Sequence, residues 1–90
     1  MARFEASYDL RKPGRNYEPL YKRLADWRAV RVLQSVWIIE TNSSAATIRD
    51  DLAKYLDAND GLLVTGLTGE AAWQKLEGMS DQFMLGKRAA

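Results

Sequence analysis

The chain has 90 residues, a formal net charge of +1, 47% hydrophobic and 28% charged residues, and neither cysteine nor histidine. That length allows one domain with a small core. The missing residue types exclude disulfides, thiolate zinc sites and histidine-based triads, so any catalysis must use carboxylates, hydroxyls, Lys or Arg, or a hard cation held by oxygen ligands.

The apolar residues are spread along the sequence. No apolar run approaches the roughly 20 residues that a bilayer-spanning helix needs. The N-terminal stretch MARFEASYDL lacks the apolar core of a signal peptide. We therefore expect a cytoplasmic protein that does not contact a membrane.

Residues 2–10, ARFEASYDL, alternate between apolar and polar side chains and predict a strand with one covered face. Asp9 lies near the end of this strand. The loop that follows, LRKPGR, is marked by a Pro-Gly pair. Apolar residues then recur at helical spacing and predict an amphipathic helix to about Trp27, with Pro19 in its first turn.

Residues 29–41, AVRVLQSVWIIET, are rich in β-branched and aromatic side chains and predict strand structure. The apolar parts flank Gln34-Ser35. This pair is either a bulge in one strand or a very tight hairpin between two strands, and the periodicity does not decide between them.

A second helix is predicted after Ser43 or Ser44, with an apolar stripe of Ile48, Leu52, Tyr55 and Leu56. The turn at 59–61 leads to a short strand, LLVTGLT. Thr68 can cap a short third helix over residues 70–77, which Gly78 would end. We expect the tail, residues 79–90, to be partly docked through its apolar triplet at 83–85.

The order β-α-β(β)-α-β predicts an α+β fold, a ferredoxin-like sandwich over residues 1–78 with an added C-terminal helical segment. Two helices would cover one face of the sheet. The other face would carry Ser7 and Asp9, and we expect it to meet a partner subunit.

Two motifs carry a resemblance to known families. YDL (8–10) closes the first strand, and RVLQSVW (31–37) lies on the second. The pattern resembles that of the second CRISPR-associated protein family, the small dimeric partner of the spacer integrase, and of the related virulence-associated protein D ribonucleases. Both families share a ferredoxin-like fold. The C-terminal part of this sequence predicts a helix, whereas the integrase partner commonly has another strand there. This difference favours a stand-alone relative over a member of a spacer-acquisition complex.

The resemblance implies a homodimer in which the two copies of Asp9 face each other across the two-fold axis. Such a pair could hold one Mg²⁺, and Asp9 would then be both metal ligand and catalytic residue of an endonuclease acting on RNA or DNA phosphodiesters. Tyr8, Ser35 and Trp37 would be structural residues near that site. Since activity is absent in some family members, a role as a nucleic-acid platform stays open.

The charges are distributed unevenly. Up to residue 31 there are eight Lys and Arg against four Asp and Glu, and from residue 32 onward five against eight. A local basic surface can bind phosphate in a nearly neutral chain. The candidate nucleic-acid-binding residues are Arg11, Lys12, Arg15 and Arg31.

Each candidate has a structural alternative. Asp9 could simply cap the strand end, and the loop could be solvated or could neutralise Asp9. Arg31 could form a cross-strand ion pair. Most aromatic residues belong to a core, and Trp37 is the candidate for the uncovered face, where it could stack on bases. The pair Asp50-Asp51 is expected on a solvated helix face.

Two functional hypotheses follow. The first is a dimeric nucleic-acid-associated protein with Mg²⁺-dependent endonuclease activity. The alternative is a non-catalytic protein-interaction or regulatory module of a defence or mobile-element system, which would bind another protein through its C-terminal helix.

Overall fold

The computed structural model describes residues 1–78 and 84, and its helices and strands lie between residues 2 and 66 apart from a helical position at Met84. The elements are β1 (Ala2–Asp9), α1 (Glu18–Asp26), β2 (Val30–Leu33), β3 (Val36–Thr41), α2 (Ala45–Ala53) and β4 (Gly61–Gly66). None of the helices in this part of the chain has the length and apolar character that a bilayer crossing requires.

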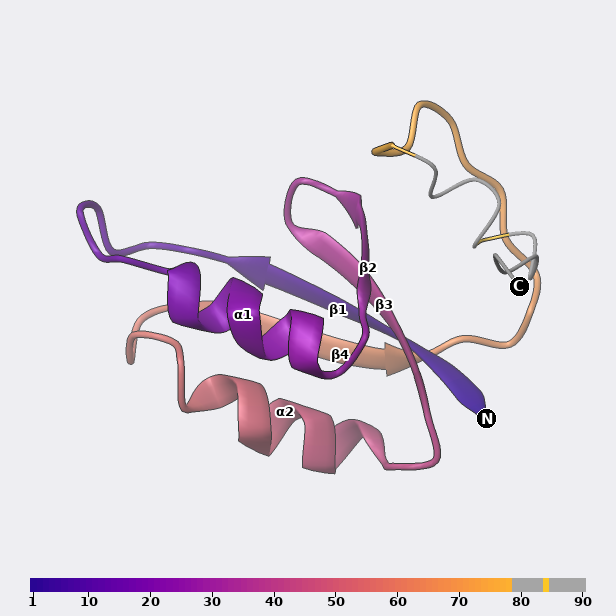
Figure 1. Cartoon of the computed structure of the whole chain (residues 1–90), viewed down its shortest axis with the longest axis horizontal. Helices are drawn as coiled ribbons and strands as arrows, with labels where there is room; N and C mark the ends of the chain where they lie inside the picture. Colours follow the sequence, from indigo (N-terminus) through magenta and orange to yellow (C-terminus); the bar gives the residue numbers. More distant parts are fainter. Residues whose placement is uncertain (79–83, 85–90) are drawn as a thin grey trace.

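The strands form one antiparallel sheet in the order β2-β3-β1-β4. Both helices lie on the same side of this sheet (Figure 1). The fold is therefore α+β, with a four-stranded antiparallel sheet and two helices in the described residues. It is compatible with the ferredoxin-like class that the element order predicted.

The core lies between the sheet and the helices. The apolar positions of β1 (Phe4, Ala6 and Tyr8) are buried against residues of α1 and α2, among them Leu20, Leu24, Ile48 and Leu52. Complete burial of a Leu or Ile side chain stabilises the fold by about 1.5–3 kcal/mol. The predicted alternation of the first strand is confirmed, and so are the apolar stripes of both helices, except that α2 ends at Ala53 and Tyr55 and Leu56 pack against the core from beyond it.

Residues 29–41 form a tight hairpin rather than one bulged strand. Gln34 and Ser35 make the turn between β2 and β3, and the pairing slips between Arg31 and Leu33. The Gln34 carbonyl accepts hydrogen bonds from the Arg31 guanidinium (2.6 and 3.0 Å) and the Tyr8 hydroxyl (3.3 Å). These donors satisfy a turn carbonyl that the strand ladder leaves unpaired.

The prediction that Trp37 lies on the uncovered face of the sheet is wrong. Trp37 pairs with Ala6 across the sheet, so it lies on the helix-covered face, where its side chain is only 8% exposed. Its indole Nε1 donates a hydrogen bond of 3.0 Å to the Tyr8 hydroxyl. Trp37 is a core residue and offers no surface for stacking on a base.

The predicted helix over 70–77 is not formed. Residues 67–78 contain no helix, and Gly69 and Lys75 have left-handed φ angles of +107° and +54°. A helix of this length is marginal without a face to bury. Instead, the Glu77 N–H donates to the Val32 carbonyl (2.9 Å) on edge strand β2. The part of the expected C-terminal helix that falls within residues 67–78 is therefore irregular.

This irregular segment lies against the sheet face opposite the helices. Residues 67–72 line a hollow with Arg3, Glu5, Ile38 and Glu40 of β1 and β3. The predicted tail, 79–90, lies outside the described residues except for Met84, whose carbonyl accepts a 3.4 Å hydrogen bond from Arg3. Part of the face expected to meet a partner subunit is thus covered by the chain itself.

Candidate site at the end of strand β1

Asp9 is the last residue of β1 and pairs with Gly61, the first residue of β4. Side chains alternate along a strand. Since Tyr8 faces the core, Asp9 projects on the opposite sheet face, together with Ser7. The Asp9 side chain is 69% exposed. Residues 7–9 and 61–63 line a shallow, open hollow of about 310 Å³ at this point.

The Arg11 side chain binds back to the end of the strand. Its Nε lies 3.0 Å from the Asp9 carboxylate, and its Nη1 donates a 3.2 Å hydrogen bond to the Asn59 carbonyl. A Cβ built on Gly61 would lie 3.1 Å from Arg11 Nη2, so the bare glycine leaves the space that the guanidinium occupies. We call Asp9, the Asn59 carbonyl and Gly61 the Arg11 docking site.

Asp60 ties the start of the loop to the turn before β4. Its carboxylate accepts hydrogen bonds from the Arg11 N–H (2.6 Å), the Tyr17 hydroxyl (2.7 Å) and the Asp57 N–H (2.8 Å). Burial favours a higher pKa for Asp60, but these donors outweigh it and hold the pKa of its carboxyl below the usual range. Burial and the Asp60 carboxylate raise the pKa of Tyr17.

The rest of the basic loop, residues 11–15, is held less firmly. The Arg15 N–H donates to the Lys12 carbonyl (3.2 Å) across a turn in which Gly14 has a φ of +81°. Arg15 also lies 3.6 Å from the Asp57 carboxylate and over the Tyr17 ring. Lys12 is exposed, and its ammonium has no ion-pair partner within residues 1–78 and 84.

Tyr8, Arg31 and Trp37 lie at the same end of the sheet, on the helix-covered face. The Tyr8 N–H donates to the Ser35 carbonyl at 3.1 Å, which places the hairpin turn beside the end of β1. The Arg31 guanidinium lies over the rings of Tyr21 (5.0 Å) and Trp37 (5.4 Å). Burial raises the pKa of the Tyr8 hydroxyl. Arg31 and Asp9 therefore lie on opposite faces of the sheet.

The described residues of one chain do not form a cluster of metal ligands around Asp9. Within residues 1–78 and 84 there is no group of three or more Asp, Glu, His or Cys residues that could hold a metal. Asp9 supplies a single carboxylate, and Arg11 already contacts it. A site built on Asp9 would require carboxylates from a second copy of the chain.

The sequence reasoning missed an ion-pair cluster between the helices. Asp51 on α2, expected on a solvated face, accepts two hydrogen bonds from Arg23 (2.7 and 3.0 Å) and one from the Trp27 indole (2.8 Å). Its side chain is 15% exposed, whereas that of Asp50 is 68% exposed. The helical spacing of Arg23 and Trp27 was the available signal, since it puts both on one side of α1.

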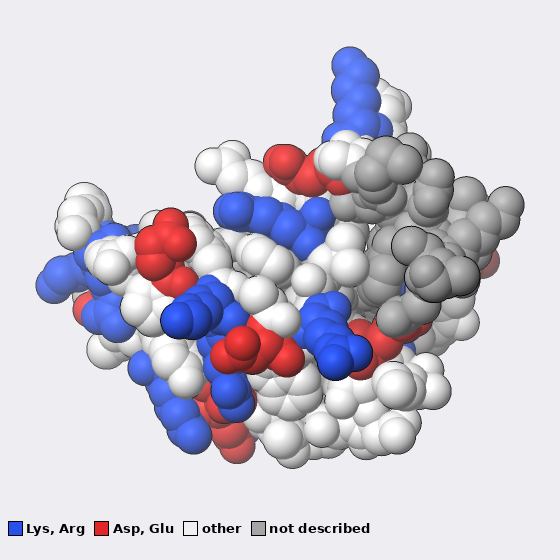
Figure 2. Space-filling model, viewed as in Figure 1, with Lys and Arg blue, Asp and Glu red and all other residues white. Residues whose placement is uncertain are grey.

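The surface charge is less one-sided than the sequence suggests. Several of the basic residues up to position 31 form ion pairs within the described chain, among them Arg3, Arg11, Arg15 and Arg23. On the face that carries both helices, positive and negative side chains are interspersed (Figure 2). Any phosphate-binding surface must therefore be local.

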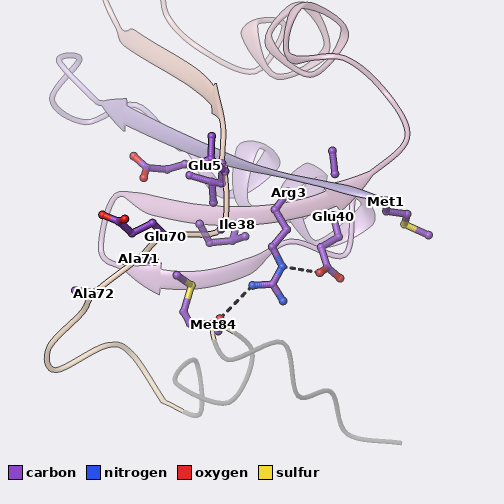
Figure 3. Close-up of a pocket in the computed structure, with 13 residues that line it drawn as sticks. Met1, Arg3, Glu5, Ile38, Glu40, Glu70, Ala71, Ala72 and Met84 are labelled. Carbon is purple, nitrogen blue, oxygen red and sulfur yellow. Dashed lines mark hydrogen bonds and ion pairs between the residues drawn. The ribbon is translucent and has the colours of Figure 1, made fainter.

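A second hollow, of about 510 Å³, lies on the other sheet face beside the C-terminal segment. Figure 3 shows Arg3 between Glu40 and Met84, with both contacts drawn. The Arg3 and Glu40 side chains are 2.7 Å apart and only 22% and 18% exposed. The pair fastens β1 to β3 and, through the Met84 carbonyl, holds part of the tail beside the sheet.

No family model matches the sequence, and no solved structure matches the chain.

Proposed function

We propose that this chain is a homodimeric, nucleic-acid-associated protein of ferredoxin-like fold, a stand-alone relative of the second CRISPR-associated protein family and of the virulence-associated protein D ribonucleases. The observation that carries this proposal is the end of β1. There, an exposed acid, Asp9, adjoins a basic loop in which Lys12 is unpaired within the described chain and Arg11 is held by an exposed ion pair.

Phosphate contact would come mainly from the basic loop. Lysine and arginine side chains that neutralise phosphates supply an affinity that is independent of sequence and falls steeply with salt. Asp60 supports this role because its hydrogen bonds fix the start of the loop beside Asp9. Arg31 lies on the other face of the sheet and belongs to the proposal only as a support of the hairpin.

The exposed side chain of Leu63 supports the dimer part of the proposal. In the sheet register Leu63 pairs with Ser7, so it lies on the same face as Asp9, and 60% of its surface is exposed. A second copy packed there would bury this side chain and bring two Asp9 carboxylates near each other. Leu63→Asp is expected to convert a dimer to a monomer in sedimentation velocity. A wild-type monomer at all concentrations would contradict the dimer.

The endonuclease part of the proposal depends on that dimer, since Asp9 is the one carboxylate that the described residues of a single chain would give to this site. The test is to incubate wild type and Asp9→Ala with labelled RNA and DNA, with Mg²⁺ and with EDTA. Cleavage by the wild type alone, and only with Mg²⁺, is the expected result for an endonuclease. Equal cleavage by both proteins would point to a contaminant, and binding without cleavage would leave a nucleic-acid platform.

A second candidate is a non-catalytic protein-interaction module. It draws on the internal pairing of Arg3, Arg11, Arg15 and Arg23 and on the hollow beside the C-terminal segment, which apolar and charged side chains line together. Tight binding to a protein partner, together with no salt-dependent binding to RNA or DNA, would favour this candidate over the first.

A further inference from the structure

We infer that Arg11 is a phosphate-contacting residue whose affinity is set by Asp9, because a guanidinium with Nε on Asp9 and Nη1 on the Asn59 carbonyl must leave these partners to give a phosphate two parallel hydrogen bonds. The inference rests on the proposed function and assigns a regulatory contact within the same site. It gives Asp9 a role that needs no metal, namely competition with the phosphate for one guanidinium.

The main chain and the side chain of Arg11 are held differently. The Arg11 N–H is fixed by the Asp60 carboxylate at 2.6 Å, and Asp60 is fixed in turn by Tyr17 and Asp57. The Arg11 side chain is 56% exposed and contacts an Asp9 side chain that is 69% exposed. Ion pairs this exposed are weak and readily exchanged. The guanidinium can therefore turn outward while the loop start stays in place.

The docking site itself favours exchange over permanent pairing. Only one guanidinium nitrogen, Nε, lies within hydrogen-bonding distance of the Asp9 carboxylate, and Nη1 donates to a neutral carbonyl of Asn59. A phosphate can accept two parallel hydrogen bonds from an arginine, a stronger arrangement than a single contact. An incoming phosphate thus offers Arg11 a better partner than Asp9 provides in this geometry.

Gly61 provides a way to test this without changing any charge. A methyl group at this position would lie 3.1 Å from Arg11 Nη2, the far end of a flexible side chain, and at an ordinary contact distance of 3.5 Å from Asp9 Cβ. Gly61 lies in β4 with an ordinary φ. Gly61→Ala should therefore displace the guanidinium and leave the pairing of β1 with β4 intact.

The first measurement is binding of a labelled single-stranded oligonucleotide at low salt. We expect Asp9→Asn and Gly61→Ala each to tighten binding by about two- to fivefold, which corresponds to the loss of one exposed ion pair. Arg11→Gln should weaken binding, and in its presence Asp9→Asn should lose most of its effect. Unchanged or weaker binding by both folded variants, Asp9→Asn and Gly61→Ala, would overturn the inference.

The second measurement follows the Arg11 Nε–H resonance by NMR while inorganic phosphate is added, with the assignment made from Arg11→Lys. We expect the wild-type resonance to move toward its position in Asp9→Asn. If it moves but no oligonucleotide binds, the exchange stands and the proposed function fails. If oligonucleotides bind and the resonance stays, the proposed function stands and the inference fails. If neither occurs, both fail.

Discussion

Asp51 on α2 accepts two hydrogen bonds from the guanidinium of Arg23 on α1, at 2.7 and 3.0 Å, and so joins the two helices on top of the sheet. The Trp27 indole donates a third hydrogen bond to the same carboxylate. Because the Asp51 side chain is only 15% exposed, this contact is better shielded from solvent than the other helix-surface pairs, such as Arg49 with Asp50.

The contact of Asp51 with Arg23 and Trp27 should make a measurable contribution to the free energy of unfolding. Asp51→Asn is expected to lower the free energy of unfolding by about 1–2 kcal/mol, because hydrogen bonds between charged groups are lost and Arg23 is left unpaired there. The matched control is Asp50→Asn, which should change stability by less than about 0.5 kcal/mol. Denaturant unfolding of both variants provides the measurement. Equal effects of the two substitutions would show that the helices do not depend on Asp51.

The same carboxylate should contribute to acid sensitivity. The hydrogen bonds from Arg23, followed by that from Trp27, hold the pKa of Asp51 below its ordinary value of 3.8, although burial opposes them. A carboxyl with a lowered pKa in the folded state stabilises the protein above its unfolded pKa, and this contribution is lost as the pH falls through the lower, folded value. The stability advantage of wild type over Asp51→Asn should therefore be constant above about pH 5 and shrink below about pH 4. An advantage that stays constant through that range would contradict the assignment.

The Tyr8 hydroxyl should contribute to the stability of the core. It accepts from the Trp37 indole at 3.0 Å and donates to the Gln34 carbonyl, so Tyr8→Phe leaves a buried N–H without its acceptor. We expect a loss of about 1–3 kcal/mol in the free energy of unfolding. Tyr21→Phe is the control, since the Tyr21 ring packs beside both residues but its hydroxyl makes no hydrogen bond within the described chain. Equal effects of the two substitutions on thermal unfolding would argue against a stabilising role for the Tyr8 hydroxyl.

The elements that were predicted correctly are those whose signal is local. Alternation along residues 2–9 and the 3.6-residue period of Leu20, Leu24, Ile48 and Leu52 each report which face is buried, and the core formed accordingly. The choice at Gln34-Ser35 depended on hydrogen bonds from Tyr8 and Arg31. Periodicity within residues 29–41 carries no information about a donor as distant as Tyr8, nor about the side-chain contact of Arg31 with the turn.

The candidate site, too, could be predicted from the sequence only in its local features. The sequence placed Asp9 at a strand end beside a basic loop, which the structure confirms, but the docking of Arg11 depends on Asn59 and Gly61, nearly 50 residues away. Asp51 was assigned to solvent because its neighbours along the helix are polar. Its partners belong to another helix. The C-terminal segment had the composition of a helix, yet its Glu77 N–H pairs with edge strand β2.

Two apolar residues on the same sheet face test whether the C-terminal segment covers it. Ile38 is 2% exposed and lines the hollow beside that segment, whereas Leu63 is 60% exposed. Ile38→Ala should cost about 2–4 kcal/mol of stability, because it opens a cavity in a packed region. Leu63→Ala should cost less than about 0.5 kcal/mol in the monomer. A small cost at Ile38 would mean that the segment does not pack on the sheet in solution.

Lys12 provides the sharpest test of phosphate contact by the basic loop, because its ammonium has no ion-pair partner within residues 1–78 and 84. Lys12→Gln should weaken oligonucleotide binding across sequences and reduce the slope of log affinity against log salt by about 0.7–0.9, the value for one released counterion. Lys54→Gln, at the end of α2 and outside the loop, is the matched control and should leave the slope unchanged. Fluorescence anisotropy over a range of salt concentrations measures both. Equal slopes for wild type and Lys12→Gln would remove the loop from the nucleic-acid interface even if the protein binds nucleic acid elsewhere.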